Sequence, residues 1–94
     1  MQIILNAFSF LREKLAERNI AYLNAPMNVP EKMSILGLID SIGLDQKSVE
    51  AVFVNHKVMP KETIIHDGDR IALIPPGTPG SYRLMLGMKK MGED

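Results

Sequence analysis

Two apolar runs near opposite ends of the main part of the chain constrain its fold more than any other feature. Residues 3–5 are Ile-Ile-Leu, and residues 71–74 are Ile-Ala-Leu-Ile. Consecutive apolar residues, many of them β-branched, are typical of strands that are covered on both faces. The long segment between the runs supplies the crossover that parallel strands require. We therefore expect the two runs to form the central, parallel pair of a mixed sheet.

The clearest helix is predicted over residues 34–42. Ser34 suits the N-cap, and Gly43 suits the position just after the last turn. The apolar residues between them follow the spacing of one helix face; they are Ile35, Leu38, Ile39 and Ile42. We expect this face to be buried against the two central strands.

A second amphipathic helix is predicted over residues 7–20, with Ser9 as a possible N-cap. Phe8, Leu11 and Leu15 are spaced as on one helix face, and charged residues fill the positions between them. We expect this helix to follow directly on the first strand.

Residues 21–29 and 52–58 are predicted to form peripheral strands. Pro26 limits the first of these segments to a sheet edge, because proline cannot donate a ladder hydrogen bond. In the second, residues 52–54 and 57–58 suit a hairpin whose two-residue turn is Asn55-His56.

Residues 63–65 are predicted to form a further short strand, and Asp67-Gly68-Asp69 a tight turn. The resulting order of elements is typical of an α+β roll. We expect a mixed sheet with one main helix, residues 34–42, across one face.

Length and composition exclude several classes of protein. The 94 residues suffice for one small domain, which we expect to cover residues 1–80, with residues 81–94 as a C-terminal extension. Eleven basic residues balance eleven acidic ones, whereas nucleic-acid binding usually goes with a basic excess. The chain has no cysteine, so thiol nucleophiles and thiolate metal sites are excluded. Without a basic leader or a membrane-length apolar run, we expect a cytoplasmic protein that does not bind membranes.

Histidines, acidic residues and serines give little sign of catalysis or metal binding. His66 precedes Asp67-Gly68-Asp69, but this spacing lacks the further ligands of a calcium loop, and a turn is the simpler interpretation. His56 is expected at a hairpin tip. No serine lies in a Gly-x-Ser-x-Gly elbow. We therefore predict no catalytic residue, no metal site and no cofactor.

Four segments together resemble the β-grasp (ubiquitin-like) sulfur carriers of the MoaD/ThiS family. The resemblance extends over residues 1–80, and its closing block is the most specific part. The four segments are Ala7-Phe8 with Leu11-Arg12-Glu13, the helix of residues 34–44 with its Gly-Leu exit, Val52-Phe53-Val54-Asn55 with Lys57-Val58, and the block of residues 67–76, which ends in Pro75-Pro76.

The resemblance implies a carrier that is not itself an enzyme. In this family an ATP-dependent adenylating enzyme activates the carboxylate of a terminal Gly-Gly, and sulfur then replaces the adenylate. The thiocarboxylate donates its sulfur, through a second biosynthetic enzyme, in molybdenum- or tungsten-cofactor (molybdopterin) or thiamine biosynthesis. Here Pro79 and Gly80 occupy the positions of the two glycines. Residues 81–94 would have to be removed before Gly80 could carry sulfur.

The extension also supports a different hypothesis, a ubiquitin-like binding module without carrier chemistry. Residues 81–94 contain apolar side chains at spacings of two and of three, so periodicity fits both a strand and a helix. The segment could cover apolar surface of its own domain or contact a partner. The residues expected at a partner contact are Pro75, Pro76, Gly77, Tyr82, Leu84, Met85 and Leu86.

Overall fold

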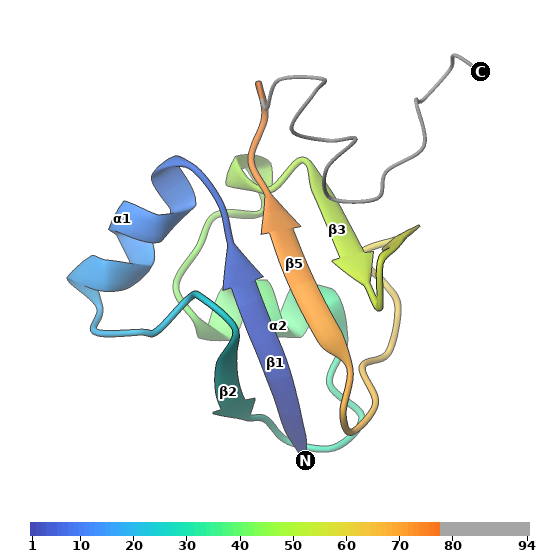
Figure 1. Ribbon diagram of the computed structural model, residues 1–94. Helices are drawn as coiled ribbons and strands as arrows, with labels where there is room; N and C mark the ends of the chain where they lie inside the picture. The colour runs from blue at the N-terminus through green and yellow to red at the C-terminus, as the bar shows by residue number, and fades with distance from the viewer. Residues whose placement is uncertain (78–94) are drawn as a thin grey trace.

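The computed structural model describes residues 1–77, which form a mixed five-stranded sheet and two α-helices (Figure 1). The strands lie in the order β2-β1-β5-β3-β4. In chain order the elements are β1 (Gln2–Ala7), α1 (Phe10–Glu17), β2 (Ala25–Asn28), α2 (Ile35–Ser41), the 3-10 helix η1 (Gln46–Ser48), β3 (Ala51–Val54), β4 (Lys57–Met59) and β5 (Arg70–Ile74).

The two apolar runs form the central pair of the sheet, as predicted. β1 and β5 run parallel, in a register that pairs Leu5 with Ile71 and Ala7 with Leu73. β2 and β3 flank this pair and run antiparallel to it. One detail of the prediction is wrong: Ile4 is only half-buried, because it points away from the helices.

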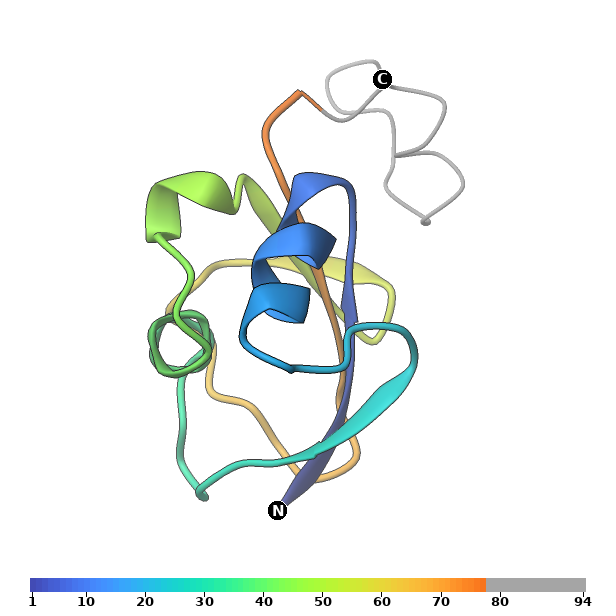
Figure 2. The ribbon, with the colours of Figure 1, turned by 90° about the vertical axis from the view of Figure 1, so that its left-hand side faces the viewer.

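The main core lies between the sheet and the two helices, which are both on one side of it (Figure 2). Odd-numbered residues of β1 and β5 point into this core, since side chains alternate along a strand. The predicted face of α2 meets them. Ile35, Leu38 and Ile39 are fully buried, and Ile42 nearly so.

The start of α2 explains why residues 63–65 do not form the expected strand. Ser34 caps the helix, and its Oγ accepts a hydrogen bond from the Gly37 amide at 3.0 Å. The carbonyls of Lys61 and Thr63 accept from the first two helical amides. This segment therefore satisfies the donors of a helix end instead of pairing along a strand, and it keeps one isolated bridge to Ser34.

α1 is shorter than predicted, because β1 extends through Ala7. Ser9 is the N-cap, but its side chain makes no capping hydrogen bond; its φ of 56° turns the chain sharply between strand and helix. Leu11 and Leu15 are buried in the core as expected. Phe8 is not part of the helix. Both predicted helices are present, and α1, with 8 residues, is about as long as α2, with 7.

The peripheral strands agree with the sequence-based predictions. β2 contains Pro26 and lies at one edge of the sheet, and β4 lies at the other. Asn55 and His56 connect β3 to β4 with φ of 53° and 71°, the left-handed conformation that a two-residue hairpin turn requires.

Replacing Leu38 with alanine should lower the free energy of unfolding by about 2–5 kcal/mol, the usual cost of emptying a buried leucine site. Leu36, two residues before Leu38 on the same helix, is only half-buried. The Leu36→Ala variant is therefore the matched control and should lose less. Urea denaturation of both variants measures the difference, and equal losses would show that the buried face of α2 is misassigned.

Candidate functional site

The chain leaves the sheet at the carboxyl end of β5, through Pro75, Pro76 and Gly77. Pro75 is buried, whereas Pro76 and Gly77 are exposed. Neither proline can donate a backbone hydrogen bond, so the ladder ends here. Gly77 has a φ of +83°, which favours glycine at this position. The three residues predicted from the sequence thus form the exit of the chain from the sheet.

Parallel pairing brings the end of β1 to the same edge as this exit. Ala7 pairs with Leu73, so Phe8 follows beside Ile74. On the other side of β5, the amide of Glu50 donates to the Ile74 carbonyl at 2.8 Å, just before β3 begins. The exit is therefore framed by the end of β1 and the start of β3.

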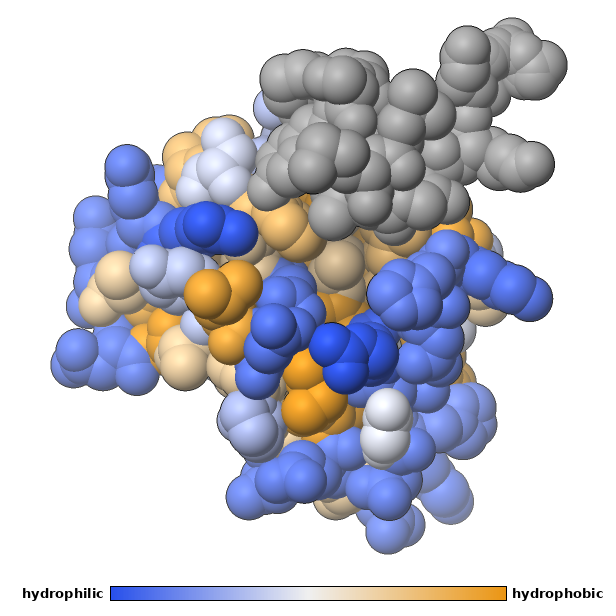
Figure 3. Space-filling model, viewed as in Figure 1, coloured by the Kyte–Doolittle hydropathy of each residue, from blue (hydrophilic) through white to orange (hydrophobic). Residues whose placement is uncertain are grey.

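A second apolar cluster lies on the sheet face that points away from both helices. It consists of Phe8, Ala51, Phe53, Ala72 and Ile74, which we call the outer-face cluster. The register explains it: Phe53 pairs with Ala72, and Ala51 pairs with Ile74. Figure 3 views this face, and on its visible part apolar residues are interspersed with polar ones, within a largely polar rim.

Arg12 holds the β1–α1 connection beside this cluster. Its Nε donates to the Ala7 carbonyl at 2.8 Å. Its guanidinium carbon lies 5.5 Å from the centre of the Phe8 ring and 5.7 Å from that of Tyr22, within the range of cation–π attraction. These contacts fix the position of Phe8 next to the chain exit.

Polar contacts cover the opposite part of the same face. The side chains of Asn6 and Asn24 are hydrogen-bonded to each other, and Arg70 donates to the Asn24 Oδ1 at 3.0 Å. Asn6 Oδ1 also accepts from the Asn24 amide. The outer face is therefore apolar toward the chain exit and polar toward the other end of β5.

The outer-face cluster was not predicted from the sequence. The alternation of Ala72 and Ile74 in β5, with Phe53 between two buried valines, was the available signal. Phe8 was assigned to a helix face, which hid its role. The other predicted site residues, Pro79, Gly80, Tyr82, Leu84, Met85 and Leu86, lie outside the described residues.

The acidic turn next to His66 has a structural role. Asp69 is 9% exposed, and its two carboxylate oxygens accept from the Asn55 side chain at 2.9 Å and the His66 amide at 2.8 Å. Asp67 accepts from the Gln2 amide at 2.8 Å. Gly68 has a φ of +86°, as the predicted tight turn requires. These contacts support the interpretation as a turn.

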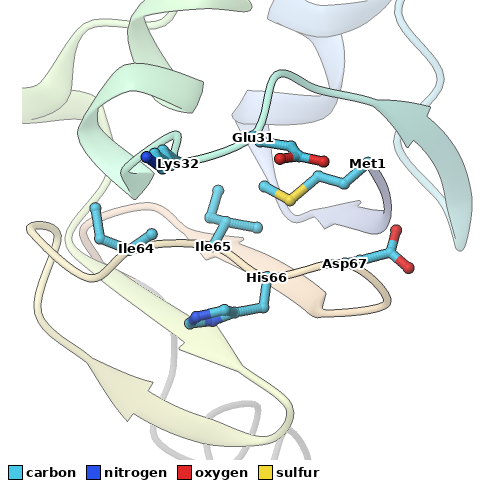
Figure 4. Close-up of a pocket in the computed structure, with 7 residues that line it drawn as sticks. All are labelled: Met1, Glu31, Lys32, Ile64, Ile65, His66 and Asp67. Atoms are coloured by element: carbon cyan, nitrogen blue, oxygen red, sulfur yellow. The ribbon is translucent and has the colours of Figure 1, made fainter.

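A shallow pocket of about 280 Å³ adjoins this turn (Figure 4). The side chains of Met1 and Ile65 face one another across it, whereas the His66 ring points to the other side of its segment and the Asp67 carboxylate points away from that ring. Within residues 1–77, no group of three potential metal-ligating side chains comes together.

The fold is that of the ubiquitin-like β-grasp proteins. SAMP1 from Haloferax volcanii superimposes with a TM-score of 0.59 at 15% identity, over 85% of this chain and all of that one. The putative molybdopterin converting factor subunit 1 from Pyrococcus furiosus gives 0.58 at 18%, over 81% and 98%. A further structure of H. volcanii small archaeal modifier protein 1 gives 0.58 at 15%, over 80% and 97%. At these identities the likeness establishes the fold.

Family membership comes from the sequence itself. Residues 9–80 match the model of the ThiS family, and the chain belongs to that family. The predicted resemblance is therefore confirmed. ThiS and MoaD proteins are small ubiquitin-fold sulfur carriers, which generally are not enzymes and act with partner enzymes. No curated protein matches the chain in sequence. No helix in residues 1–77 is long and apolar enough to cross a membrane.

Replacing Asp69 with alanine should lower the free energy of unfolding by about 1–3 kcal/mol, because two donors lose their acceptor, one of them a backbone amide. Asp67→Ala is the matched control, since Asp67 is exposed and accepts one bond in the same turn. Urea denaturation should show the larger loss for Asp69→Ala. A larger loss for Asp67→Ala would contradict the role assigned to Asp69.

Proposed function

We propose that this chain is the precursor of a sulfur carrier whose working terminus is Gly80. The observation that carries the proposal is that the family match ends at residue 80. Gly80 lies six residues after the end of β5, so a chain that ended there would carry its carboxylate on a short tail. A short, narrow tail of this kind suits entry into the active site of a partner enzyme.

The chemistry requires a free carboxylate at Gly80. That carboxylate attacks the α-phosphorus of ATP in the partner enzyme, pyrophosphate leaves, and an acyl adenylate forms. A sulfur nucleophile at the oxidation level of sulfide then displaces AMP and gives the thiocarboxylate. In the sequence, Gly80 is joined to Ser81 by a peptide bond. Hydrolysis of this bond, with loss of residues 81–94, must therefore precede activation.

Pro79 makes the terminus differ from a Gly-Gly tail. Its φ is fixed near −65° and it has no amide hydrogen, so the last two residues are stiffer and donate one hydrogen bond fewer. We propose that the partner adenylating enzyme accepts this Pro-Gly end. The stiff end loses less conformational entropy when it enters an extended channel.

We propose that the partner enzymes contact the molecule beside the chain exit, where Pro76 and Gly77 are exposed and Phe8 is half-buried. An enzyme that receives the terminus must come close to this surface, whereas Phe53 and Ile74 of the outer-face cluster are buried. Apolar surface with aromatic residues is typical of the centre of a protein interface. The sulfur acceptor lies in molybdopterin or thiamine biosynthesis, and the structural neighbours, a converting factor subunit and a modifier protein, favour no single acceptor.

Truncation after Gly80 should create a substrate for the adenylating enzyme. Incubated with ATP and the cognate enzyme, the truncated chain should gain the mass of an adenylate, whereas the full chain should not. A chain truncated after Pro79 is the matched control for the identity of the terminus and should react poorly. Mass spectrometry measures all three. A truncated chain that remains folded but unreactive would exclude the carrier function.

The intact mass of the protein in its native cell distinguishes the carrier from a binding module. A carrier should be found ending at Gly80. The binding module of the alternative hypothesis should retain residues 81–94 and should lose partner capture or stability when they are removed. Recovery of only the full-length form, together with such a loss, would favour the module.

A further inference from the structure

We propose that the free edge of β4 binds an extended, acidic segment of a partner protein, which adds a strand to the sheet. β4 (Lys57–Met59) is the last strand in the order β2-β1-β5-β3-β4, so only one side of it is paired. The backbone of such an edge strand offers donors and acceptors to a further strand. This surface differs from the chain exit, which lies between the end of β1 and the start of β3.

The register identifies the backbone groups that are free. The turn between β3 and β4 has two residues, so Val54 and Lys57 form the hydrogen-bonded pair that closes the hairpin. Bonded and non-bonded pairs alternate along an antiparallel ladder, which makes Phe53 and Val58 a non-bonded pair. The amide and the carbonyl of Val58 therefore point away from β3. Val58 is 46% exposed, and no other backbone group of residues 1–77 bonds to it.

The other edge of the sheet is less suited to accept a strand. In β2, Pro26 lies opposite Ile4 of β1. The Ile4 amide donates to the Asp69 carbonyl, on the side away from β2, so Pro26 belongs to a non-bonded pair and faces the free edge. Proline has no amide hydrogen to donate there. We therefore assign the added strand to β4.

An apolar groove borders β4 on the helix side of the sheet. Lys57 and Met59 point to this side, because side chains alternate along a strand and Val58 points to the other. Both line a groove of about 330 Å³, together with Ile64 and His66 of the segment that precedes β5. Ile64 is 45% exposed. An added strand would thus meet an apolar site at Met59 and Ile64, with the cation of Lys57 beside it.

The charge of Lys57 is available to a partner. Lys57 is exposed, and no side chain of residues 1–77 forms an ion pair or a hydrogen bond with its ammonium group. Asp69 lines the same groove, but its two carboxylate oxygens already accept from the Asn55 side chain and the His66 amide. A carboxylate on the added strand would pair with Lys57, whereas a basic strand would be repelled.

The geometry points to a sequence pattern for the occupant. Antiparallel pairing is the more stable direction per residue. A strand that pairs with Val58 in this direction places its preceding residue over Met59 and its following residue beside Lys57. The segment should therefore read apolar, β-branched, acidic from its N-terminus.

A partner protein is favoured over a second copy of this chain. Pairing of β4 with β4 about Val58 would place Met59 opposite Lys57 and would leave the lysine without a counter-ion. Pro60 follows directly and cannot donate to a longer ladder. A second copy would thus gain a short ladder with no charge pairing.

The test is an NMR titration of the isotope-labelled full chain with the end-blocked peptide Ser-Leu-Val-Glu-Ser. We expect the Val58 amide resonance to shift and its hydrogen exchange to slow, and the methyl resonances of Met59 and Ile64 to shift. Ile39, buried on α2, should stay unchanged. The same peptide methylated on its valine nitrogen cannot donate to the Val58 carbonyl and should not bind.

Variants of the protein test the charge. Lys57→Glu should weaken binding of this peptide severalfold, and replacing the peptide's glutamate with lysine should restore it. Lys14→Glu makes the same charge change at an exposed position of α1 and is the matched control, which should bind as the unchanged chain does. The peptide of reversed sequence, Ser-Glu-Val-Leu-Ser, should bind more weakly.

An unshifted Val58 amide at saturating peptide would overturn the proposal, as would equal binding of the methylated peptide or equal binding by Lys57→Glu. Slow exchange of the Val58 amide in the free chain would show that the edge is already occupied, and this outcome also contradicts the proposal. If that protection grew with protein concentration, the occupant would be a second copy. The measurement needs no adenylating enzyme, so it is independent of the carrier function.

Discussion

The parallel pairing of β1 with β5 is the constraint on which the rest of the structure depends. It joins strands from the two ends of the described chain and places everything between them in the crossover. Both strands point the same way, so Phe8 and Pro75 leave the sheet at one edge. A hairpin-type, antiparallel pairing would have put these exits at opposite edges. The apolar cluster beside the chain exit is thus a consequence of strand direction.

Polar contacts connect the strands at the other end of the sheet, where β1 and β5 begin. The amide of Gly68 donates to the Gln2 carbonyl at 2.7 Å, and the Ile4 amide donates to the Asp69 carbonyl at 3.0 Å, so the turn before β5 is tied to β1. Asn55 connects the same turn to the β3–β4 hairpin: its side chain donates to Asp69 and accepts from the Arg70 amide. These bonds set the register of three strands, and register decides which residues face the core.

The sequence predicted the fold well where periodicity and turn chemistry agree. Ile35, Leu38 and Ile39 follow one helix face, and Ser34 begins that helix, so α2 could be placed almost to the residue. The strand predicted over residues 63–65 is absent, although its apolar, β-branched residues suit a strand. Here the carbonyl of Thr63 serves the unpaired donors of a helix end, and such a long-range demand leaves no local pattern in the sequence.

The candidate site was harder to predict for a related reason. Pro75, Pro76 and Gly77 were found because they interrupt the apolar pattern, but Phe8 and Phe53 come together only once the register is known. Phe8 also fits a helix pattern, and the sharp turn at Ser9, with φ of 56°, has no strong sequence signal. The chain belongs to a family of sulfur carriers, and the outer-face cluster lies beside the exit of the chain from the sheet. A sheet with helices on one side exposes its other face to water unless something covers it. Such an exposed face is normally polar. In this chain the polar contacts cover one part of the face, and the apolar part lies where the remaining residues of the chain begin.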